Sequence, residues 1–258
     1  MSSNVASLVL QRSQFTKLLS AVKLIENSCT DCHISEGFVR QKTNDRQSIV
    51  EMNLTNILGD NELVLGNLKQ KIMLLKSFEL DDSTTVTDEN IKIDITTNDY
   101  HFIDPLTKMS FRKPLTKFLD NTYLSSNQLG EMVKIFEENL VFSVSISAYV
   151  AKRIRGICQG FNNESIRCDF KGGNAVFSIS TLNNENTSIV KDDIVLNKEL
   201  DNVYFKAAYL PFSLDNNSEI TFSTYQMSKD TLVCKYNLNY TDIPISIYSL
   251  VKLIDTDE

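Results

Sequence analysis

The chain has 258 residues, of which 42% are hydrophobic, and its formal net charge is −7. This length allows one large domain or two ordinary domains, and the apolar content is sufficient for a folded core. No apolar run approaches the ~18 residues of a membrane helix, and the start of the chain lacks the features of a signal peptide. We therefore expect a soluble, intracellular protein.

Four segments carry apolar residues at helical spacing. They cover residues 13–26, 67–77, 147–159 and 199–210, and the last has the weakest pattern. A further possible helix, 127–137, has Leu129, Met132, Val133 and Phe136 along one side.

The segments between these helices alternate apolar and polar residues, are rich in β-branched residues and end at turn residues, as is typical of strands. The first half contains the predicted strands 5–10, 32–34, 38–42, 48–54 and 91–96. The second half contains 140–146, 165–170, 175–180, 188–196, 219–223, 231–237 and 245–253. Strand, helix, three strands, helix and further strands thus occur twice at nearly the same spacing, which indicates two domains of one α+β architecture. The alternative is coincidence among approximate boundaries.

Positive charge is concentrated on the four main helices and their flanks, although the whole chain is acidic. The basic residues are Arg12, Lys17, Lys23, Lys69, Lys71, Lys76, Lys152, Arg153, Arg155, Lys198 and Lys206. These eleven stand against three acidic residues, whereas the rest of the chain has 15 basic and 30 acidic residues. Lysine is ordinary on any one solvated helix, but the combined pattern favours phosphate contacts with DNA without base reading.

A two-domain chain of this length, with paired helix-strand repeats and cationic helices in an acidic protein, resembles the DNA sliding clamp family, which includes the eukaryotic proliferating cell nuclear antigen and the clamps of tailed phages. Three short stretches agree. Ser35-Glu36-Gly37-Phe38-Val39 resembles a turn between early strands. Asp88-Glu89-Asn90-Ile91-Lys92-Ile93, followed by Tyr100-His101-Phe102-Ile103-Asp104-Pro105, is similar to the end of the first domain in phage clamps. The terminus from Leu250 to Glu258 resembles the final strand and acidic tail of the eukaryotic protein.

This resemblance implies an α+β fold of two similar clamp-type domains, each with antiparallel sheets on the outside and two helices on the inner face. The domains would be 1–104 and 139–258, joined by a connector, 105–138, that contains the extra helix. Three subunits would close head to tail into a ring around double-stranded DNA, with the eleven basic residues facing DNA. DNA polymerase and a clamp loader would be partners. Tyr248, Leu250 and Val251 are candidates for a partner-peptide pocket, with plain sheet core as the alternative.

The motif Cys29-Thr30-Asp31-Cys32-His33 has the spacing of a c-type haem attachment site. Haem attachment usually needs export, and zinc would need further ligands, yet His101 is the only other histidine. The five cysteines are odd in number and scattered, so we expect reduced thiols and no cofactor or metal. The sequence also lacks a nucleophile elbow, a P-loop and a Gly-rich dinucleotide turn, so we expect no enzyme activity.

Two other function classes remain open at this stage. One is a viral structural or assembly protein of two β-rich domains, which would need no cationic helices. The other is a clamp-fold processivity factor that grips DNA as a monomer or dimer. The Asn, Lys and Ile content favours an AT-rich genome, such as that of a virus or phage. We expect the protein to act in the cytoplasm of the host cell or at another site of DNA replication.

Overall fold

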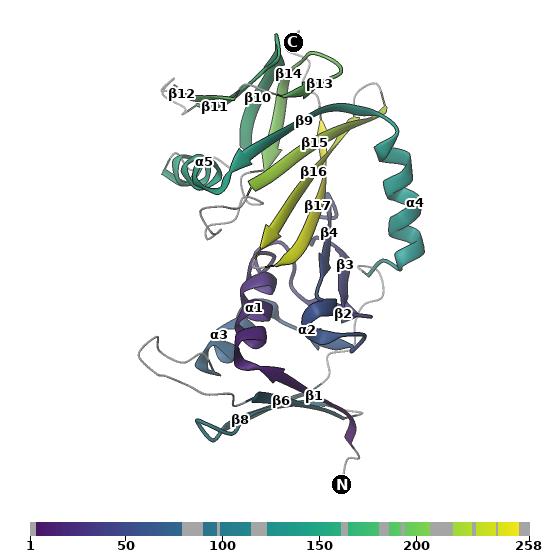
Figure 1. Cartoon of the computed structure of the whole chain (residues 1–258), viewed down its shortest axis with the longest axis vertical. Coiled ribbons are helices and arrows are strands. Elements are labelled where there is room, and N and C mark those ends of the chain that lie inside the picture. The colour runs from purple at the N-terminus through teal and green to yellow at the C-terminus, as the bar shows by residue number, and fades with distance from the viewer. Residues whose placement is uncertain are drawn as a thin grey trace. The chain divides into compact units, whose positions relative to one another are not determined.

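The computed structural model describes residues 4–78, 90–96, 99–114, 123–160, 165–180, 186–191, 194–206, 219–228, 231–240 and 242–252. The chain forms two compact units (Figure 1). The first consists of Met1–Asp45 and Glu51–Tyr123, and the second of Arg46–Val50 and Leu124–Glu258. No helix in the described ranges is long and apolar enough to cross a membrane.

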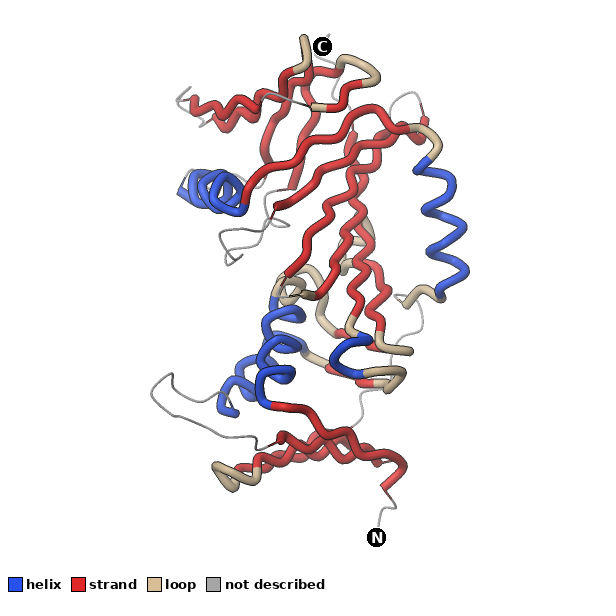
Figure 2. The backbone as a smooth tube through the Cα atoms, in the orientation of Figure 1, coloured by secondary structure: helices blue, strands red, loops and turns tan. Residues whose placement is uncertain are grey.

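Within its described residues, the first unit has three helices, one 3₁₀ turn and strands of two sheets (Figure 2). In chain order its elements are β1 Asn4–Gln11, α1 Arg12–Lys23, β2 Cys32–Ser35, β3 Phe38–Lys42, β4 Ser48–Asn53, α2 Thr55–Leu58, β5 Leu63–Leu65, α3 Leu68–Leu75, the 3₁₀ turn Lys76–Phe78, β6 Asn90–Thr96, β7 Asp99–Asp104 and β8 Met109–Pro114. The strand orders are β1-β6-β7-β8 and β4-β3-β2-β5. β4 is divided, because its residues up to Val50 cluster with the second unit.

The second unit has the same plan. Its elements are α4 Ser126–Glu137, β9 Leu140–Ser147, α5 Ala148–Gly160, β10 Ser165–Lys171, β11 Asn174–Ser180, β12 Asn186–Lys191, β13 Val195–Leu196, β14 Leu200–Lys206, β15 Glu219–Ser228, β16 Thr231–Tyr240 and β17 Ile243–Lys252. The strand orders β9-β15-β16-β17 and β12-β11-β10-β14 repeat the two orders of the first unit. The expected α+β class with antiparallel sheets, built twice from one plan, is therefore confirmed.

Each unit buries its own core between the sheets and helices. In the second unit, alternate residues of β10 face inward, so Ile166, Cys168 and Phe170 are buried. Phe170 stacks on Phe142 of β9 with ring centroids 3.5 Å apart. In the first unit, Phe102 of β7 stacks on Phe111 of β8 at 4.9 Å. The contact of Phe142 with Phe170 joins the two sheets of the second unit, whereas that of Phe102 with Phe111 lies within one sheet of the first unit.

The early turn between β2 and β3 requires its glycine. Gly37 has a positive φ of +73°, and a Cβ added there would meet the carbonyl oxygen of Gly59. Only glycine fits this close approach of two backbones, so the turn that the sequence indicated has a steric cause.

The prediction of a fourth main helix over 199–210 was wrong for the residues that the structure describes. Residues Leu200–Lys206 form β14, which pairs antiparallel with β10. Val203 and Phe205, two residues apart, are both buried in the core, as alternate residues of a strand are. The burial that a strand gives these two side chains outweighs the weak helical pattern of the segment. Residues 207–210 lie outside the described ranges. β8 also falls inside the predicted connector, while the extra helix is present as α4.

Candidate functional site

Helix α1 begins directly after β1 with a reciprocal cap. The Gln11 amide N–H donates to the side chain of Gln14 at 3.0 Å, and the Gln11 side chain accepts from the backbone in return. The helix buries Phe15, Leu18, Leu19, Ala21 and Val22. Its solvent side carries the exposed Lys23 and the half-buried Lys17, and the helix contains no acidic residue.

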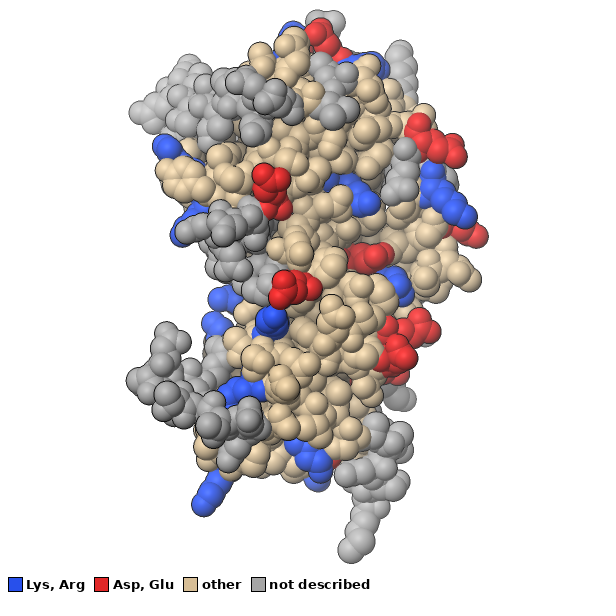
Figure 3. Space-filling model, viewed as in Figure 1, with Lys and Arg blue, Asp and Glu red and all other residues tan. Residues whose placement is uncertain are grey.

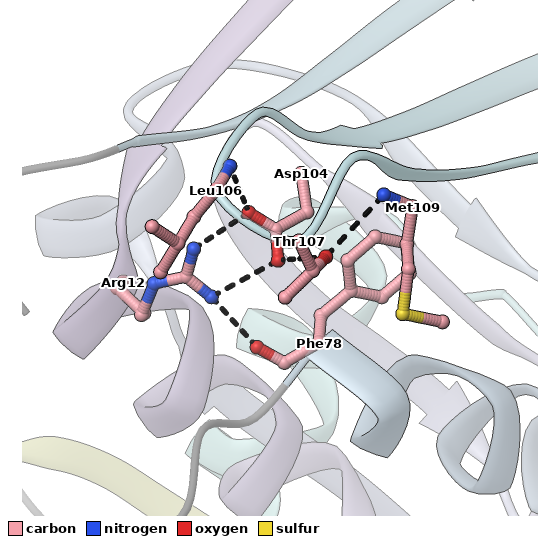
Figure 4. Close-up of polar contacts among 6 residues, drawn as sticks. All are labelled: Arg12, Phe78, Asp104, Leu106, Thr107 and Met109. Carbon is pink, nitrogen blue, oxygen red and sulfur yellow. Dashed lines mark hydrogen bonds and ion pairs between the residues drawn. The ribbon is translucent and has the colours of Figure 1, made fainter. Parts of the chain in front are cut away.

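Arg12, at the start of α1, takes part in a buried ion pair (Figure 4). Its Nη2 donates to Asp104 at 2.6 Å, and its Nη1 donates to the carbonyl oxygen of Phe78 at 2.8 Å. Asp104 also accepts from the Thr107 hydroxyl at 2.7 Å and from the Leu106 amide at 3.1 Å. Burial acts to raise the pKa of the Asp104 carboxyl, but these donors outweigh burial and hold its pKa below the usual value.

Arg12 thus joins α1 to the β7–β8 turn and to the end of the 3₁₀ turn. The side chain of Arg12 is only 14% exposed. We therefore leave Arg12 out of the DNA-facing set that the sequence suggested.

Helix α3 separates its lysines onto two sides. Lys69 is exposed, as is Lys76 just beyond the helix, and the neighbouring Met73 is 70% exposed. Lys71 is buried at 1% exposure. The spacing explains this, because Lys71 lies three residues after Leu68 on the apolar face that continues to Ile72 and Leu75. Lys71 is therefore not available to a ligand at the surface.

Helix α5 carries exposed basic residues of the second unit. Its exposed residues are Tyr149, Lys152, Arg153, Gly156, Gln159 and Gly160. The helix buries Ala148, Ala151, Ile154 and Cys158. Lys152 and Arg153 therefore lie on the exposed side of the helix, and Arg155 lies at the edge of that side.

Arg155 is half-buried, and burial lowers its pKa to about 10, so it stays positive at neutral pH. The Arg153 guanidinium lies 5.9 Å from the centroid of the Tyr149 ring. The sequence analysis missed Tyr149, although the four-residue spacing to Arg153 was a usable signal. Blue side chains lie over α5 in one unit and over α1 and α3 in the other (Figure 3).

The last two predicted basic residues do not lie on a helix. Lys198 is exposed just before β14, and its Nζ donates to Gln226 Oε1 at 3.2 Å. Lys206 ends β14, and its side chain lies outside the described residues. Among the predicted basic residues that the structure describes, those that reach solvent on helices therefore lie on α1, α3 and α5, with Lys76 directly after α3.

The three pocket candidates of β17 do not come together. Tyr248 and Val251 are 7% and 5% exposed, whereas Leu250 is 47% exposed. Residues two apart on a strand share a face, so Tyr248 and Leu250 point to one side and Val251 to the other. Tyr248 belongs to an apolar cluster with Ile49, Leu124, Leu129, Tyr225 and Val233, against which Met132, Val133 and Leu140 pack.

The cysteine motif has the properties of a structural element. Cys29 and Cys32 are buried, and burial raises the pKa of the Cys29 thiol to about 11 and that of Cys32 further. His33 Nε2 instead lies 2.7 Å from Glu62. Within the described ranges, no group of three His, Cys, Asp or Glu side chains could hold a metal ion. Buried thiols with raised pKa are poor nucleophiles and poor ligands.

Comparison with known proteins gives a clear result at the level of structure. No protein-family model matches the chain, and no curated protein matches it. The crystal structure of proliferating cellular nuclear antigen from Entamoeba histolytica is similar, with a TM-score of 0.64 and 12% identity, over 98% of this chain and 100% of that one. The chain has the sliding-clamp fold.

A second sliding clamp agrees. The PCNA2–PCNA3 complex from Sulfolobus tokodaii gives a TM-score of 0.62 and 12% identity, over 95% of this chain and 99% of the matched one. The fold that the sequence resemblance implied is thereby confirmed.

Proposed function

We propose that this chain is a subunit of a DNA sliding clamp, a ring that encircles duplex DNA and tethers DNA polymerase. The observation that carries the proposal is the distribution of charge. Helices α1, α3 and α5 contain no Asp or Glu, in a chain whose net charge is −7. A net acidic protein has no general reason to lack acidic residues on these three helices. A DNA-facing surface gives such a reason, because Asp and Glu would repel the phosphates.

The proposed DNA-facing residues are those whose side chains reach solvent on these helices. They are Lys17, Lys23, Lys69, Lys76, Lys152, Arg153 and Arg155. Such cations attract phosphates without reading bases. A closed ring leaves DNA only by opening, so a weak and mobile electrostatic fit is sufficient, and tight contacts would slow sliding.

Ring closure is supported by the repeated topology. In strand order β17 is followed by β4, and the Leu250 amide donates to the carbonyl of Gln47, directly before β4, at 2.9 Å. By strand order, β8 is the equivalent of β17, and β12 is the equivalent of β4. We propose that β12 of one copy pairs with β8 of the next. This head-to-tail contact hides both edges and closes a ring of three.

The proposed partners are duplex DNA, two further copies of the chain, DNA polymerase and a clamp loader that opens the ring. The protein would act where DNA is replicated and would catalyse no reaction itself. The mechanism is topological, because the ring converts a weak contact into a persistent one.

The test is the solution mass by light scattering over a range of concentrations, combined with amide hydrogen exchange. We expect a mass three times the 29.3 kDa of one chain, with protection of β8 and β12 that is lost on dilution to monomer. A monomer at every concentration, with both edges unprotected, would contradict the ring and favour a factor that grips DNA directly. A chain with no salt-dependent affinity for DNA would instead favour a structural or assembly protein.

A further inference from the structure

Helix α5 exposes an aromatic ring to solvent. Tyr149 is 61% exposed, whereas every other Phe and Tyr side chain that the structure describes is buried or half-buried. Its neighbours Ala148 and Ala151 are buried, so the ring lies on the solvent side of the helix. The Ser147 hydroxyl accepts from the Val150 amide at 3.4 Å, and this contact caps the turn that carries the ring.

The charge around Tyr149 gives its exposure a meaning, since a single exposed apolar side chain is ordinary on a protein surface. Lys152 and Arg153 follow Tyr149 by three and four residues, so the three exposed side chains share one side of the helix. The Arg153 guanidinium lies over the ring, 5.9 Å from its centroid, which is within the range of a cation–π contact. Helix α5 contains no Asp or Glu, so no carboxylate of the same helix competes for these cations.

A ring beside cations suits one ligand chemistry, which is a nucleic acid with unpaired bases. An unpaired base can stack on an aromatic ring, and the neighbouring cations attract the phosphates on either side of that base. In duplex DNA the stacked neighbours cover the faces of each base, so a ring at the surface of the duplex has no face to stack on. The positive charge also disfavours a purely apolar occupant, because burial would remove the cations from water without giving them a partner.

We propose that α5 binds single-stranded DNA by stacking an unpaired base on Tyr149, with Lys152 and Arg153 on the adjoining phosphates. This specificity rests on the proposed function, because it adds a contact for unpaired DNA to a helix that is proposed to face duplex. Single-stranded template lies next to a polymerase that is copying it. The stack therefore lets the chain distinguish DNA beside a polymerase from uninterrupted duplex.

The first measurement uses a fluorescent reporter. The chain contains no tryptophan, so Tyr149→Trp introduces a single indole ring whose emission is quenched when a base stacks on it. We expect saturable quenching by oligothymidylate, whose bases are unpaired, and no quenching by a blunt duplex of the same length.

Val9→Trp is the matched control for this reporter. Val9 is 54% exposed, and it pairs across the strands with Lys92, so a ring there also lies near a cation. The Lys92 ammonium is 2.9 Å from the Asp94 carboxylate, which neutralises it. The control reporter should therefore stay unquenched by oligothymidylate.

The second measurement is the affinity of the full chain for labelled oligothymidylate, by fluorescence anisotropy. Tyr149→Ala should weaken binding by about fivefold to about 150-fold, since one base–aromatic stack contributes about 1–3 kcal/mol. Tyr149→Phe keeps the ring and should bind as the wild type does. Tyr149→Ala removes no charge, so it should leave the slope of log affinity against log salt concentration unchanged, whereas Arg153→Gln should reduce that slope by about 0.7. Circular dichroism checks that each variant keeps its fold.

Two results would overturn the inference. One is a Tyr149→Trp reporter that stays unquenched by oligothymidylate, or that duplex quenches equally. The other is an affinity for oligothymidylate that Tyr149→Ala leaves unchanged. Either result can occur in a chain that still forms a ring and binds duplex, so the proposed clamp fails separately, through a monomeric mass and a duplex affinity that does not depend on salt.

Discussion

The ion pair of Arg12 and Asp104 offers the sharpest test of how the first unit is held together. The Asp104 side chain is 0% exposed and accepts hydrogen bonds from the Arg12 guanidinium, the Thr107 hydroxyl and the Leu106 amide. Asp104→Ala removes the acceptor of all these donors. The Arg12 guanidinium then keeps the Phe78 carbonyl, while its charge stays largely buried (Figure 4).

Breaking a buried pair by removing one partner costs about 3–5 kcal/mol. We expect Asp104→Ala to reach this range. Asp104→Asn keeps one acceptor oxygen but loses the charge, so it should cost about 1.5–3 kcal/mol. The double variant Arg12→Met, Asp104→Ala should cost less than the sum of its single changes, because no unpaired charge remains.

Urea unfolding followed by circular dichroism measures these differences. The folded pKa of Asp104 is lowered, so its contribution is fully present above the unfolded value near 3.9 and is lost as the pH falls through the folded pKa. The gap between wild type and Asp104→Asn should therefore close below about pH 4. Lys171→Ala, in the exposed pair with Asp201, is the control and should leave the midpoint unchanged. A cost under about 1 kcal/mol for Asp104→Ala at pH 7 would refute this reasoning.

Three further outcomes follow from the second unit. Changing Lys152 and Arg153 to Glu should weaken DNA binding and reduce the slope of log affinity against log salt concentration by about 2. Changing the exposed Lys108 and Lys134 to Glu is the control and should not. Equal effects of both pairs would show that α5 is not part of the DNA surface. Gly156→Ala should stabilise the chain by about 0.5–1 kcal/mol in thermal unfolding, and a lower midpoint would show that this glycine has a contact of its own. All five thiols are buried, and burial raises the pKa of the Cys158 thiol to about 11. An alkylating reagent at pH 8, with mass spectrometry as the readout, should therefore label the thiols only after denaturation. Rapid labelling of the native chain would contradict the buried positions.

The sequence by itself determined the helices α1, α3, α4 and α5 and the doubled order of elements. Apolar spacing is a local property, and α1 and α3 bury the side that their spacing indicates. Helix α5 buries Ala148, Ala151, Ile154 and Cys158, so only part of its expected apolar side is buried. The position of Lys71 could also have been deduced, since it stands on the same helical face as Leu68 and Ile72. The accumulation of basic residues on helices was likewise visible from composition alone.

Only the tertiary structure decided the features that depend on residues far apart in the chain. Arg12 meets Asp104 across 92 positions, so a basic residue counted for DNA proves to be part of the core. Residues Leu200–Lys206 become a strand because β10 offers a pairing edge. Leu140, Tyr225, Val233 and Leu250 are neighbours across β9, β15, β16 and β17 only through the register of these strands. A shift of one residue in any strand would turn its side chain to the other face. Local spacing fixes which side of an element is apolar, whereas pairing and packing fix what that side meets.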